Sequence, residues 1–396
     1  MVYPENFETR IGFDTIRNQC SALCTMRRSA ELLAEQTFST SARTIATRQA
    51  LAAEMGTILT MDCGVLKDEF FDIDTLVEKV RVEGTFLDCG EVMRLGITLA
   101  AAEAVVEIIR GKEQFKALNR LSAGVVSLSH LTREIARILD ERGDMRDNAS
   151  PELTAVRREI RQSEGQVSKR LQAVLQGAKS AGIVDAEAMI SIRDGRAVIP
   201  VAAANKRKLQ GFIHDESATG KTFYIEPVEV VELNNRLKEL EYAERREVVK
   251  ILTAFTDLVR TDIEAVTHSG EFVAQIDMIR AKARWAADND AVQPIISSGE
   301  LWLVKARHPL LAQTLKRHNR ELVPLDARLD KESRILVISG PNAGGKSVCL
   351  KTFGIIQYMF QCGFPITAAQ STELPVFDKL FIDIGDQQSI ENDLST

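Results

Sequence analysis

The sequence lacks the clustered cysteines that a structural metal site or a disulfide framework would use. Six cysteines are spread over 396 residues, and no C-x-x-C pair is matched by a second pair or by histidines. This spacing argues against a zinc site and against a fold held together by disulfides. The cysteines are Cys20, Cys24, Cys63, Cys89, Cys349 and Cys362.

The sequence also lacks a long apolar run and a leader segment. No stretch approaches the roughly 20 apolar residues of a membrane-spanning helix. The opening Met1-Val-Tyr-Pro-Glu5 does not show a charged segment followed by an apolar one, which is the pattern of a secretory signal. We therefore expect a cytoplasmic protein with reduced cysteines and no membrane partner.

Positive charge is not in excess. The 50 Lys and Arg residues are outnumbered by 56 Asp and Glu residues, which gives a net charge of −6. Wholesale nucleic-acid binding is therefore disfavoured, although a local basic patch on an acidic protein stays open. A hydrophobic content of 45% and a charged content of 27% are typical of a globular protein, and the length predicts about two to four domains.

What the sequence does contain is a complete P-loop of the form G-x-x-x-x-G-K-[ST]. It consists of Gly340, Pro341, Asn342, Ala343, Gly344, Gly345, Lys346 and Ser347. The apolar run 334–338 before it predicts a strand, and residues 348–358 after it predict a helix, which is the context that the motif needs.

The residue types of the P-loop suit phosphate binding. Glycines let successive backbone N–H groups surround phosphate oxygens, and the N-terminus of the following helix adds a positive dipole. We expect Lys346 to reach the β- and γ-phosphates of a nucleotide and Ser347 to bind Mg²⁺ through its hydroxyl group. The alternative is a glycine turn without a ligand.

The first part of the chain has a helical pattern. From residue 6 to about 135, apolar residues recur mostly at helical spacing, which predicts a packed helical core domain over residues 1–140. Ser150 as an N-cap followed by Pro151 then predicts the start of a further helix, which runs to about Lys179.

Between about 188 and 227 the pattern changes to the alternation of strands. Asp194-Gly195 lies between two β-rich runs and predicts a hairpin turn, and further strands are predicted at 211–214 and 222–225. This small sheet carries a cluster of cations that suits contact with nucleic-acid phosphates, but a solvated strand face would show the same residues. The cations are Arg193, Arg196, Lys206, Arg207, Lys208 and Lys221.

A long helical stretch is predicted from Val228 to about Asp288, with a break near Ser269-Gly270. Its apolar residues follow the three-four alternation of a coiled-coil seam. Without a break, this helix would extend on the order of 80–90 Å at 1.5 Å per residue, which is the length of a lever. Antiparallel pairing with the helix that precedes the small sheet would place the sheet at the tip of an arm.

Residues 289–396 are predicted to form strands around the P-loop, at 301–304 and 380–384 in addition to 334–338. His308, upstream of the P-loop, is a candidate contact for the nucleotide base. A structural role is the alternative for this single histidine.

Four segments together resemble the MutS superfamily of ATPases. They are the Gly-Pro-Asn-x-Gly-Gly-Lys-Ser form of the P-loop, Arg307-His308-Pro309, the segment 211–227 within the helix–β–helix arm, and the opening Tyr3-Pro-Glu-Asn-Phe7. More narrowly, the chain is similar to the bacterial MutS paralogues that lack the N-terminal mismatch-reading domains. The resemblance covers essentially the whole chain.

The resemblance implies a mixed, mainly α fold. A helical core at 1–140 would be followed by a lever and clamp arm at 141–288, with the β segment as the clamp. Residues 289–396 would form the N-terminal half of an α/β P-loop ATPase domain of the ABC type.

The resemblance also implies ATP and Mg²⁺ as cofactors, bound between the ATPase domains of a homodimer. Each site would be completed by a signature loop from the partner. Asn342 would contact the γ-phosphate beside Lys346, and Ser395, near the start of the signature loop, would contact the γ-phosphate bound by the partner.

The sequence departs from the family after the P-loop. Between Ser347 and Thr396 no apolar strand ends in an Asp-Glu pair, although hydrolysis needs acidic residues to hold Mg²⁺ and orient water. No catalytic set is therefore complete. We expect a C-terminally truncated ATPase without the family's downstream nuclease module, which binds nucleotide weakly and does not hydrolyse ATP alone.

Three functions remain open. The first is an ATP-dependent DNA-binding protein that clamps branched or mismatched DNA and affects recombination or mismatch repair. The second is a ribosome-binding ATPase that contacts rRNA and splits stalled or collided ribosomes. The third is an inactive structural remnant. The sequence does not distinguish DNA from the ribosome as the target.

Overall fold

The computed structural model describes residues 1–61, 70–341 and 345–383. The chain divides into two compact units. Unit 1 comprises Met1–Glu78, Arg94–Thr132 and Asp262–Thr396, and unit 2 comprises Lys79–Met93 and Arg133–Thr261. The predicted division into three consecutive domains stays a prediction.

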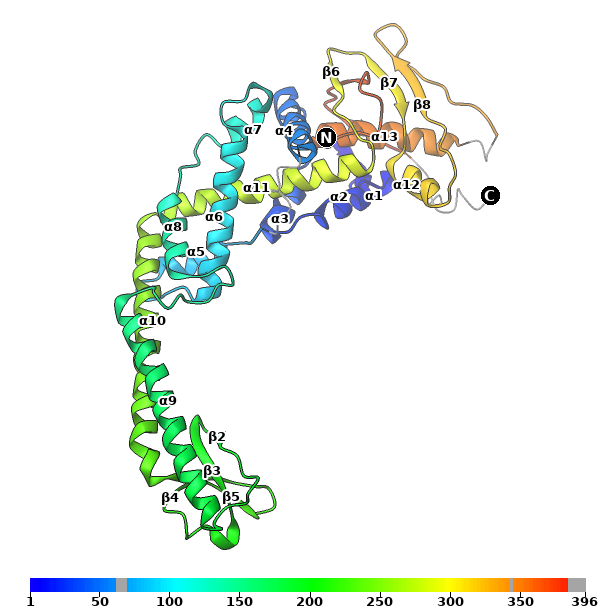
Figure 1. Ribbon diagram of the computed structural model, residues 1–396. Coiled ribbons are helices and arrows are strands. Elements are labelled where there is room, and N and C mark those ends of the chain that lie inside the picture. Colours follow the sequence, from blue (N-terminus) through cyan, green and yellow to red (C-terminus); the bar gives the residue numbers. More distant parts are fainter. Residues whose placement is uncertain (62–69, 342–344, 384–396) are drawn as a thin grey trace. The chain divides into compact units, whose positions relative to one another are not determined.

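Unit 1 is built around helix α11 (Ile263–Asp288), whose side chains are buried along most of its length. Helices α2 (Phe13–Ser21), α3 (Arg27–Glu35) and α4 (Ala42–Thr60) pack against it, as Figure 1 shows. Ser41 caps α4, because its hydroxyl oxygen accepts a hydrogen bond from Thr44 N at 3.3 Å.

Several shorter helices complete this unit, and the boundary with unit 2 falls within α5, α6 and α8. These helices are α1 (Phe7–Ile11), α5 (Asp74–Arg81), α6 (Cys89–Ile109), the 3₁₀ helix η1 (Glu113–Phe115), α7 (Lys116–Leu121), α8 (Ser129–Ile138), α12 (Pro309–Arg317) and α13 (Lys346–Cys362).

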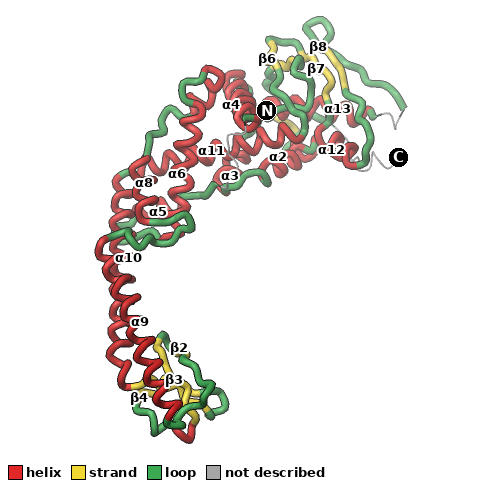
Figure 2. The backbone as a smooth tube through the Cα atoms, in the orientation of Figure 1, coloured by secondary structure: helices red, strands yellow, loops and turns green. Residues whose placement is uncertain are grey.

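The strands of unit 1 form two small sheets (Figure 2). One pairs β1 (Val2–Tyr3) with β10 (Leu380–Phe381) in parallel. The other is a mixed sheet in the order β6-β9-β7-β8, in which β6 and β9 are parallel and the remaining pairs antiparallel. Its strands are β6 (Ile295–Ser297), β7 (Leu301–Ala306), β8 (Leu325–Leu329) and β9 (Glu373–Pro375).

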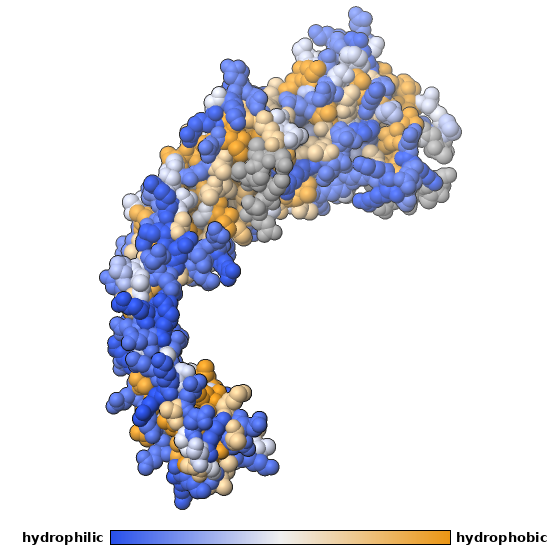
Figure 3. Space-filling view, in the orientation of Figure 1, coloured by the Kyte–Doolittle hydropathy of each residue, from blue (hydrophilic) through white to orange (hydrophobic). Residues whose placement is uncertain are grey.

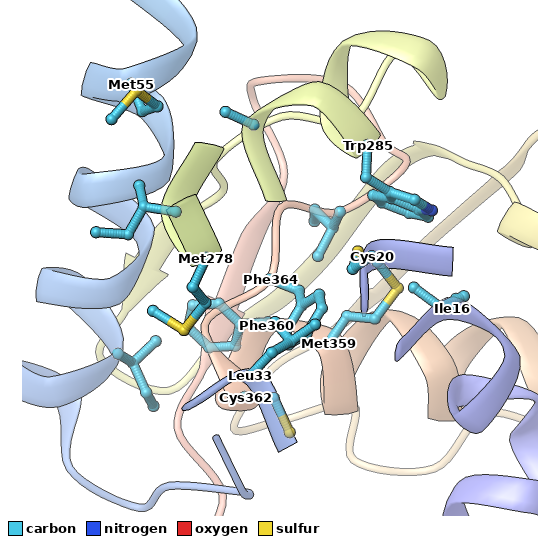
Figure 4. Close-up of a cluster of buried hydrophobic side chains, with 14 of the residues drawn as sticks. Ile16, Cys20, Leu33, Met55, Met278, Trp285, Met359, Phe360, Cys362 and Phe364 are labelled. Carbon is cyan, nitrogen blue, oxygen red and sulfur yellow. The ribbon is translucent and has the colours of Figure 1, made fainter. Parts of the chain in front are cut away.

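The core of unit 1 anchors the helix that follows the P-loop. Phe360 at the end of α13 and the nearby Phe364 lie beside Met278 of α11 and Leu33 of α3 (Figure 4), and all four are at most 6% exposed. Burying each such side chain contributes roughly 1.5–3 kcal/mol. The C-terminal half of α13 is therefore held rigidly, and its N-terminus, where the P-loop lies, is positioned by that packing.

Unit 2 contains two long helices that lie side by side, α9 (Pro151–Ser180) and α10 (Val228–Thr261), with a β-sheet at one end (Figure 1). The predicted cap of α9 is confirmed, because Ser150 Oγ accepts from Leu153 N at 3.0 Å and Pro151 follows it. The predicted antiparallel pairing, with the sheet at the tip, is also confirmed within this unit.

The sheet of unit 2 is antiparallel in the order β2-β3-β5-β4. Its inner face packs on α9, where Leu171 and Leu175 meet Ile199, Val201 and Ile225. The predicted hairpin turn is confirmed, because Asp194 and Gly195 have φ angles of 48° and 73°, as a tight hairpin requires. The strands are β2 (Ser191–Arg193), β3 (Arg196–Ala202), β4 (Gly211–Glu216) and β5 (Thr222–Pro227), with the 3₁₀ helix η2 (Ala203–Asn205) after β3.

The predicted break in the long helical stretch is at the wrong place. The chain breaks at Asp262, between α10 and α11, whereas Ser269 and Gly270 lie buried inside α11. A Cβ atom at Gly270 would lie 2.8 Å from Ile73 Cδ1, so this glycine permits close packing. A single helix of on the order of 80–90 Å is therefore not formed.

The strand predicted at 334–338 is not formed either. These residues are irregular and exposed, with Ile335 84% and Val337 81% exposed. A strand is stable only when its backbone groups pair with a neighbouring strand, and the described residues place none beside it. In contrast, the strand predicted at 301–304 is confirmed as β7, and the helix predicted at 348–358 is confirmed within α13.

The fold is thus mixed and mainly helical, as predicted, but the α/β ATPase half stays a prediction. Among the described residues, no helix has both the length and the apolar character needed to cross a membrane.

Candidate nucleotide and nucleic-acid sites

The described part of the P-loop leads directly into α13. Gly345 has a φ of 76°, which favours glycine, and the helix begins at Lys346. Lys346 Nζ donates hydrogen bonds to Gly340 O at 2.5 Å and to Pro341 O at 2.6 Å, so the ammonium group lies over the loop. Ser347 follows in the first helical turn. The other predicted nucleotide contacts, Asn342, Ala343, Gly344 and Ser395, lie outside the described residues.

His308 is placed in the interior of unit 1. It is 1% exposed, at the N-terminal end of α12. Burial, reinforced by the positive charge of Lys351, lowers the pKa of His308 to about 4, so the imidazole is neutral at neutral pH. Contact between His308 and a nucleotide base stays a prediction that requires this ring to be uncovered.

A pocket of about 320 Å³ adjoins α12 and the end of α11, and sequence reasoning did not find it. Its lining includes three cationic residues, Arg307, Lys316 and Arg320. It also includes two acidic residues, Asp288 and Asp290. Arg307 is fixed by its backbone, because Arg307 N donates to Thr367 O at 2.8 Å and its guanidinium donates to Asp290 O at 3.0 Å. The Arg307-His308-Pro309 segment marks this pocket in the sequence, and its arginine and proline, rather than its histidine, line it.

The six cations of unit 2 divide into two groups. Arg196 faces inward, where its Nη1 donates to Glu226 at 2.8 and 3.0 Å. Arg193 lies over the Tyr224 ring at 4.0 Å and pairs with Asp215 at 3.0 Å. Both arginines are therefore engaged within the protein.

The other four cations are exposed at one end of the sheet. They follow η2 or occupy the turn between β4 and β5, and Ala203 N donates to Lys221 O at 2.9 Å, which joins these two segments. No side chain of this group forms an ion pair with the described residues. Lys206 lies over the Phe223 ring at 4.4 Å. The group, named the tip cations, consists of Lys206, Arg207, Lys208 and Lys221.

The inward arginine belongs to a buried network that sequence reasoning missed. The Glu226 carboxylate is 1% exposed, accepts from Asn234 Nδ2 at 2.6 Å, and lies 2.5 Å from His214 Nε2. Burial alone would raise the pKa of Glu226, but the hydrogen bonds from Asn234, His214 and Arg196 outweigh it and hold the pKa below its usual range. This network fixes β3, β4 and β5 against the start of α10.

The chain is similar to known proteins, both around the P-loop and over most of its length. Residues 336–396 match the family model for MutS domain V, which begins just before the P-loop. A protein from Thermomicrobium roseum named endonuclease MutS2 is 37% identical over 396 residues, which cover 98% of this chain and 50% of the relative. The chain is similar to MutS2-type members of the MutS superfamily along nearly its whole length.

Other MutS2 proteins show the same level of similarity. The endonuclease MutS2 of a Geobacillus strain is 37% identical over 82% of this chain and 41% of the relative, and that of Symbiobacterium thermophilum is 37% identical over 80% and 39%. The chain thus spans at most about half the length of these curated MutS2 relatives.

Proposed function

We propose that this MutS2-type chain binds ATP with Mg²⁺ at the P-loop and grips nucleic acid with the tip of unit 2. The observation that carries the proposal is the presence of both parts in one chain, a P-loop at the start of α13 and a group of unpaired cations at the end of a long two-helix arm. Two copies would close on branched or mismatched DNA when nucleotide binds, and so affect recombination or mismatch repair.

At the nucleotide site, Lys346 would exchange its hydrogen bonds to Gly340 O and Pro341 O for contacts with phosphate oxygens. Asn342 and the partner's Ser395 would contact the γ-phosphate, and Ser347 would bind Mg²⁺. Bound Mg²⁺ neutralises phosphate charge. The chain's own part is to hold these groups at the N-terminus of α13, whose dipole favours an anion.

At the tip, the exposed cations would contact backbone phosphates. Such contacts release counterions, so binding weakens with salt in proportion to the number of phosphates neutralised. We assign this role to the tip cations rather than to all six predicted cations. Arg196 is bonded to Glu226 and Arg193 is paired with Asp215, which supports this choice.

The test is the salt dependence of binding to a branched DNA. Lys206→Ala/Arg207→Ala/Lys208→Ala should weaken binding and reduce the slope of log K against log salt by about 2–3. The matched control is Lys112→Ala/Lys116→Ala/Arg120→Ala, which removes the same charge from exposed residues of unit 1 and should leave the slope unchanged. Equal effects of the two triple variants would contradict a site at the tip.

Phosphate contacts do not distinguish DNA from rRNA. The same variants therefore decide between the DNA-binding function and the ribosome-binding alternative. Co-sedimentation with ribosomes that is lost in the tip variant, together with weak binding to branched DNA, would favour the ribosome-binding alternative.

A further inference from the structure

Strand β4 is an edge strand of the unit 2 sheet, and its centre is apolar and open. Phe212 is 60% exposed and Ile213 is 51% exposed. Soluble proteins usually protect such edges with charges or cover them, because unpaired backbone groups beside apolar side chains attract another strand. No described strand covers the outer edge of β4. This edge can therefore pair with a strand from another molecule.

The backbone of β4 presents its free groups at two positions. Gln210 O accepts from Val228 N at 3.2 Å, and Phe212 lies opposite Glu226. Since hydrogen-bonded pairs alternate along an antiparallel ladder, the backbone groups of Gly211 and Ile213 point away from β5. A Cβ at Gly211 would lie 2.2 Å from Glu226 O of β5, so this position needs glycine for β4 to pair closely with β5.

The charges that flank β4 are complementary in a reversed orientation. Arg207 and Lys208 precede the strand, whereas Asp215 and Glu216 end it, and all four are exposed. A parallel copy would place like charges side by side. An antiparallel copy places the basic end of one strand beside the acidic end of the other, which favours a second copy of this chain as the occupant.

We propose that two copies of the chain pair through β4, antiparallel and centred on Phe212. Gly211 lies opposite Ile213 of the partner subunit, and the exchanged N–H and C=O groups form two hydrogen-bonded pairs. Phe212 lies opposite the partner's Phe212 in the non-hydrogen-bonded pair between them, and the basic segment before β4 lies towards the acidic end of the partner's strand. The exposed residues Gly211, Phe212 and Ile213 thus gain backbone and apolar contacts at once.

This pairing adds a contact between two copies to the proposed function. Its biological role rests on that proposed function. Two arms joined at their tips would close a ring around a nucleic acid, with the tip cations beside the junction. The pairing itself needs neither nucleotide nor nucleic acid.

Disulfide cross-linking of the full chain tests the pairing. Opposite residues in a non-hydrogen-bonded antiparallel pair have Cα atoms about 4.5 Å apart, within the range that a disulfide spans. Phe212→Cys should therefore form a covalent dimer under mild oxidation. The rate should exceed that of a control by on the order of 100-fold, because pairing raises the effective thiol concentration from micromolar towards millimolar.

The matched control is Ile192→Cys. Ile192 is 69% exposed on β2, the opposite edge of the same sheet, so chance collisions cross-link it at least as readily. The native chain measures the background from its own cysteines. Equal rates for Phe212→Cys and Ile192→Cys would overturn the proposal.

A charge exchange tests the antiparallel orientation. In the Phe212→Cys background, Lys208→Glu should slow cross-linking because it adds a carboxylate near the acidic end of the partner's strand, and adding Glu216→Lys should restore the rate. A cross-linking rate that neither charge change alters would overturn this pairing. ATP and DNA binding are measured on the Phe212→Cys variant, whose tip cations are unchanged, so a failure of cross-linking with intact binding refutes the pairing while the proposed function stands.

Discussion

Lys282 is a fully buried cation in the core of unit 1. Its Nζ donates to Gln36 Oε1 at 2.8 Å and lies 4.6 Å from the centre of the Phe364 ring. Desolvation is the main cause that lowers the pKa of Lys282 from 10.5 to about 7, and the charges of Arg48 and Arg17 add to it. Since no carboxylate pairs with this ammonium among the described residues, its charged form is costly.

Replacing Lys282 by methionine should stabilise unit 1 most at low pH. Below pH 7 the lysine is protonated in both states and its burial penalty is complete. Between pH 7 and 10.5 the unfolded chain binds a proton that the folded chain has released, so the wild-type protein gains stability as pH rises. The advantage of Lys282→Met should thus shrink by about 2 kcal/mol between pH 7 and 9.

Urea unfolding of both proteins across this pH range measures the difference. Comparing the variant with the wild type cancels the titration of all other groups. A difference in unfolding free energy that stays constant with pH would show that Lys282 does not titrate in this range.

At the scale of elements, α11 shows how a helix can carry a glycine without ending. Gly270 is buried at the contact with Ile73, where a Cβ would lie 2.8 Å from Ile73 Cδ1. Gly165 in α9 has the same helical setting, but a Cβ there would meet nothing within 4 Å. Alanine substitutions at these two glycines therefore distinguish the effect of packing on stability from the effect of helix propensity.

Gly165→Ala should stabilise the protein by about 0.5–1 kcal/mol, because alanine is the better helix former. Gly270→Ala should destabilise it by about 1 kcal/mol, because the cost of overpacking exceeds that gain. Thermal unfolding measures both, and Gly270→Ala should cost less stability in an Ile73→Ala background, which lacks both crowded atoms, Cγ1 and Cδ1. Equal stabilisation by the two alanines would contradict the packing role of Gly270.

At the scale of the whole molecule, the proposed function couples a nucleotide site in unit 1 to a nucleic-acid site in unit 2. Such coupling is reciprocal, because the factor by which ATP changes DNA affinity equals the factor by which DNA changes ATP affinity. Substituting the P-loop lysine alters nucleotide binding, and substituting the tip cations alters nucleic-acid binding. Each of the two sites can therefore be changed separately.

ATP should therefore tighten binding to branched DNA by roughly 5-fold or more, and DNA should tighten binding of a fluorescent ATP analogue by the same factor. Lys346→Ala should weaken nucleotide binding and remove the effect of ATP on DNA affinity, while DNA affinity without ATP stays unchanged. Titrations in both directions measure the two factors. Unequal factors, or an ATP effect that survives Lys346→Ala, would contradict the coupling.

The features that the sequence alone determined are local ones. The Asp194-Gly195 turn, the Ser150 cap and the helix after the P-loop depend on residues within a few positions of each other, so they form as predicted. Short motifs likewise carry the resemblance to a protein family. The basic cluster could be predicted because its residues are close in sequence, although only the tip cations are exposed in the structure.

The tertiary structure decided whatever depends on a partner distant in sequence. Residues 334–338 have the composition of a strand but remain irregular, because a strand forms only against a neighbour. Arg196 points inward because the sheet and α10 bring Glu226 and Asn235 to it. Gly270 lies inside α11 rather than at its end, and a Cβ there would crowd Ile73, so tertiary packing accounts for this glycine. Pairing and packing between distant segments, rather than local propensity, set these outcomes.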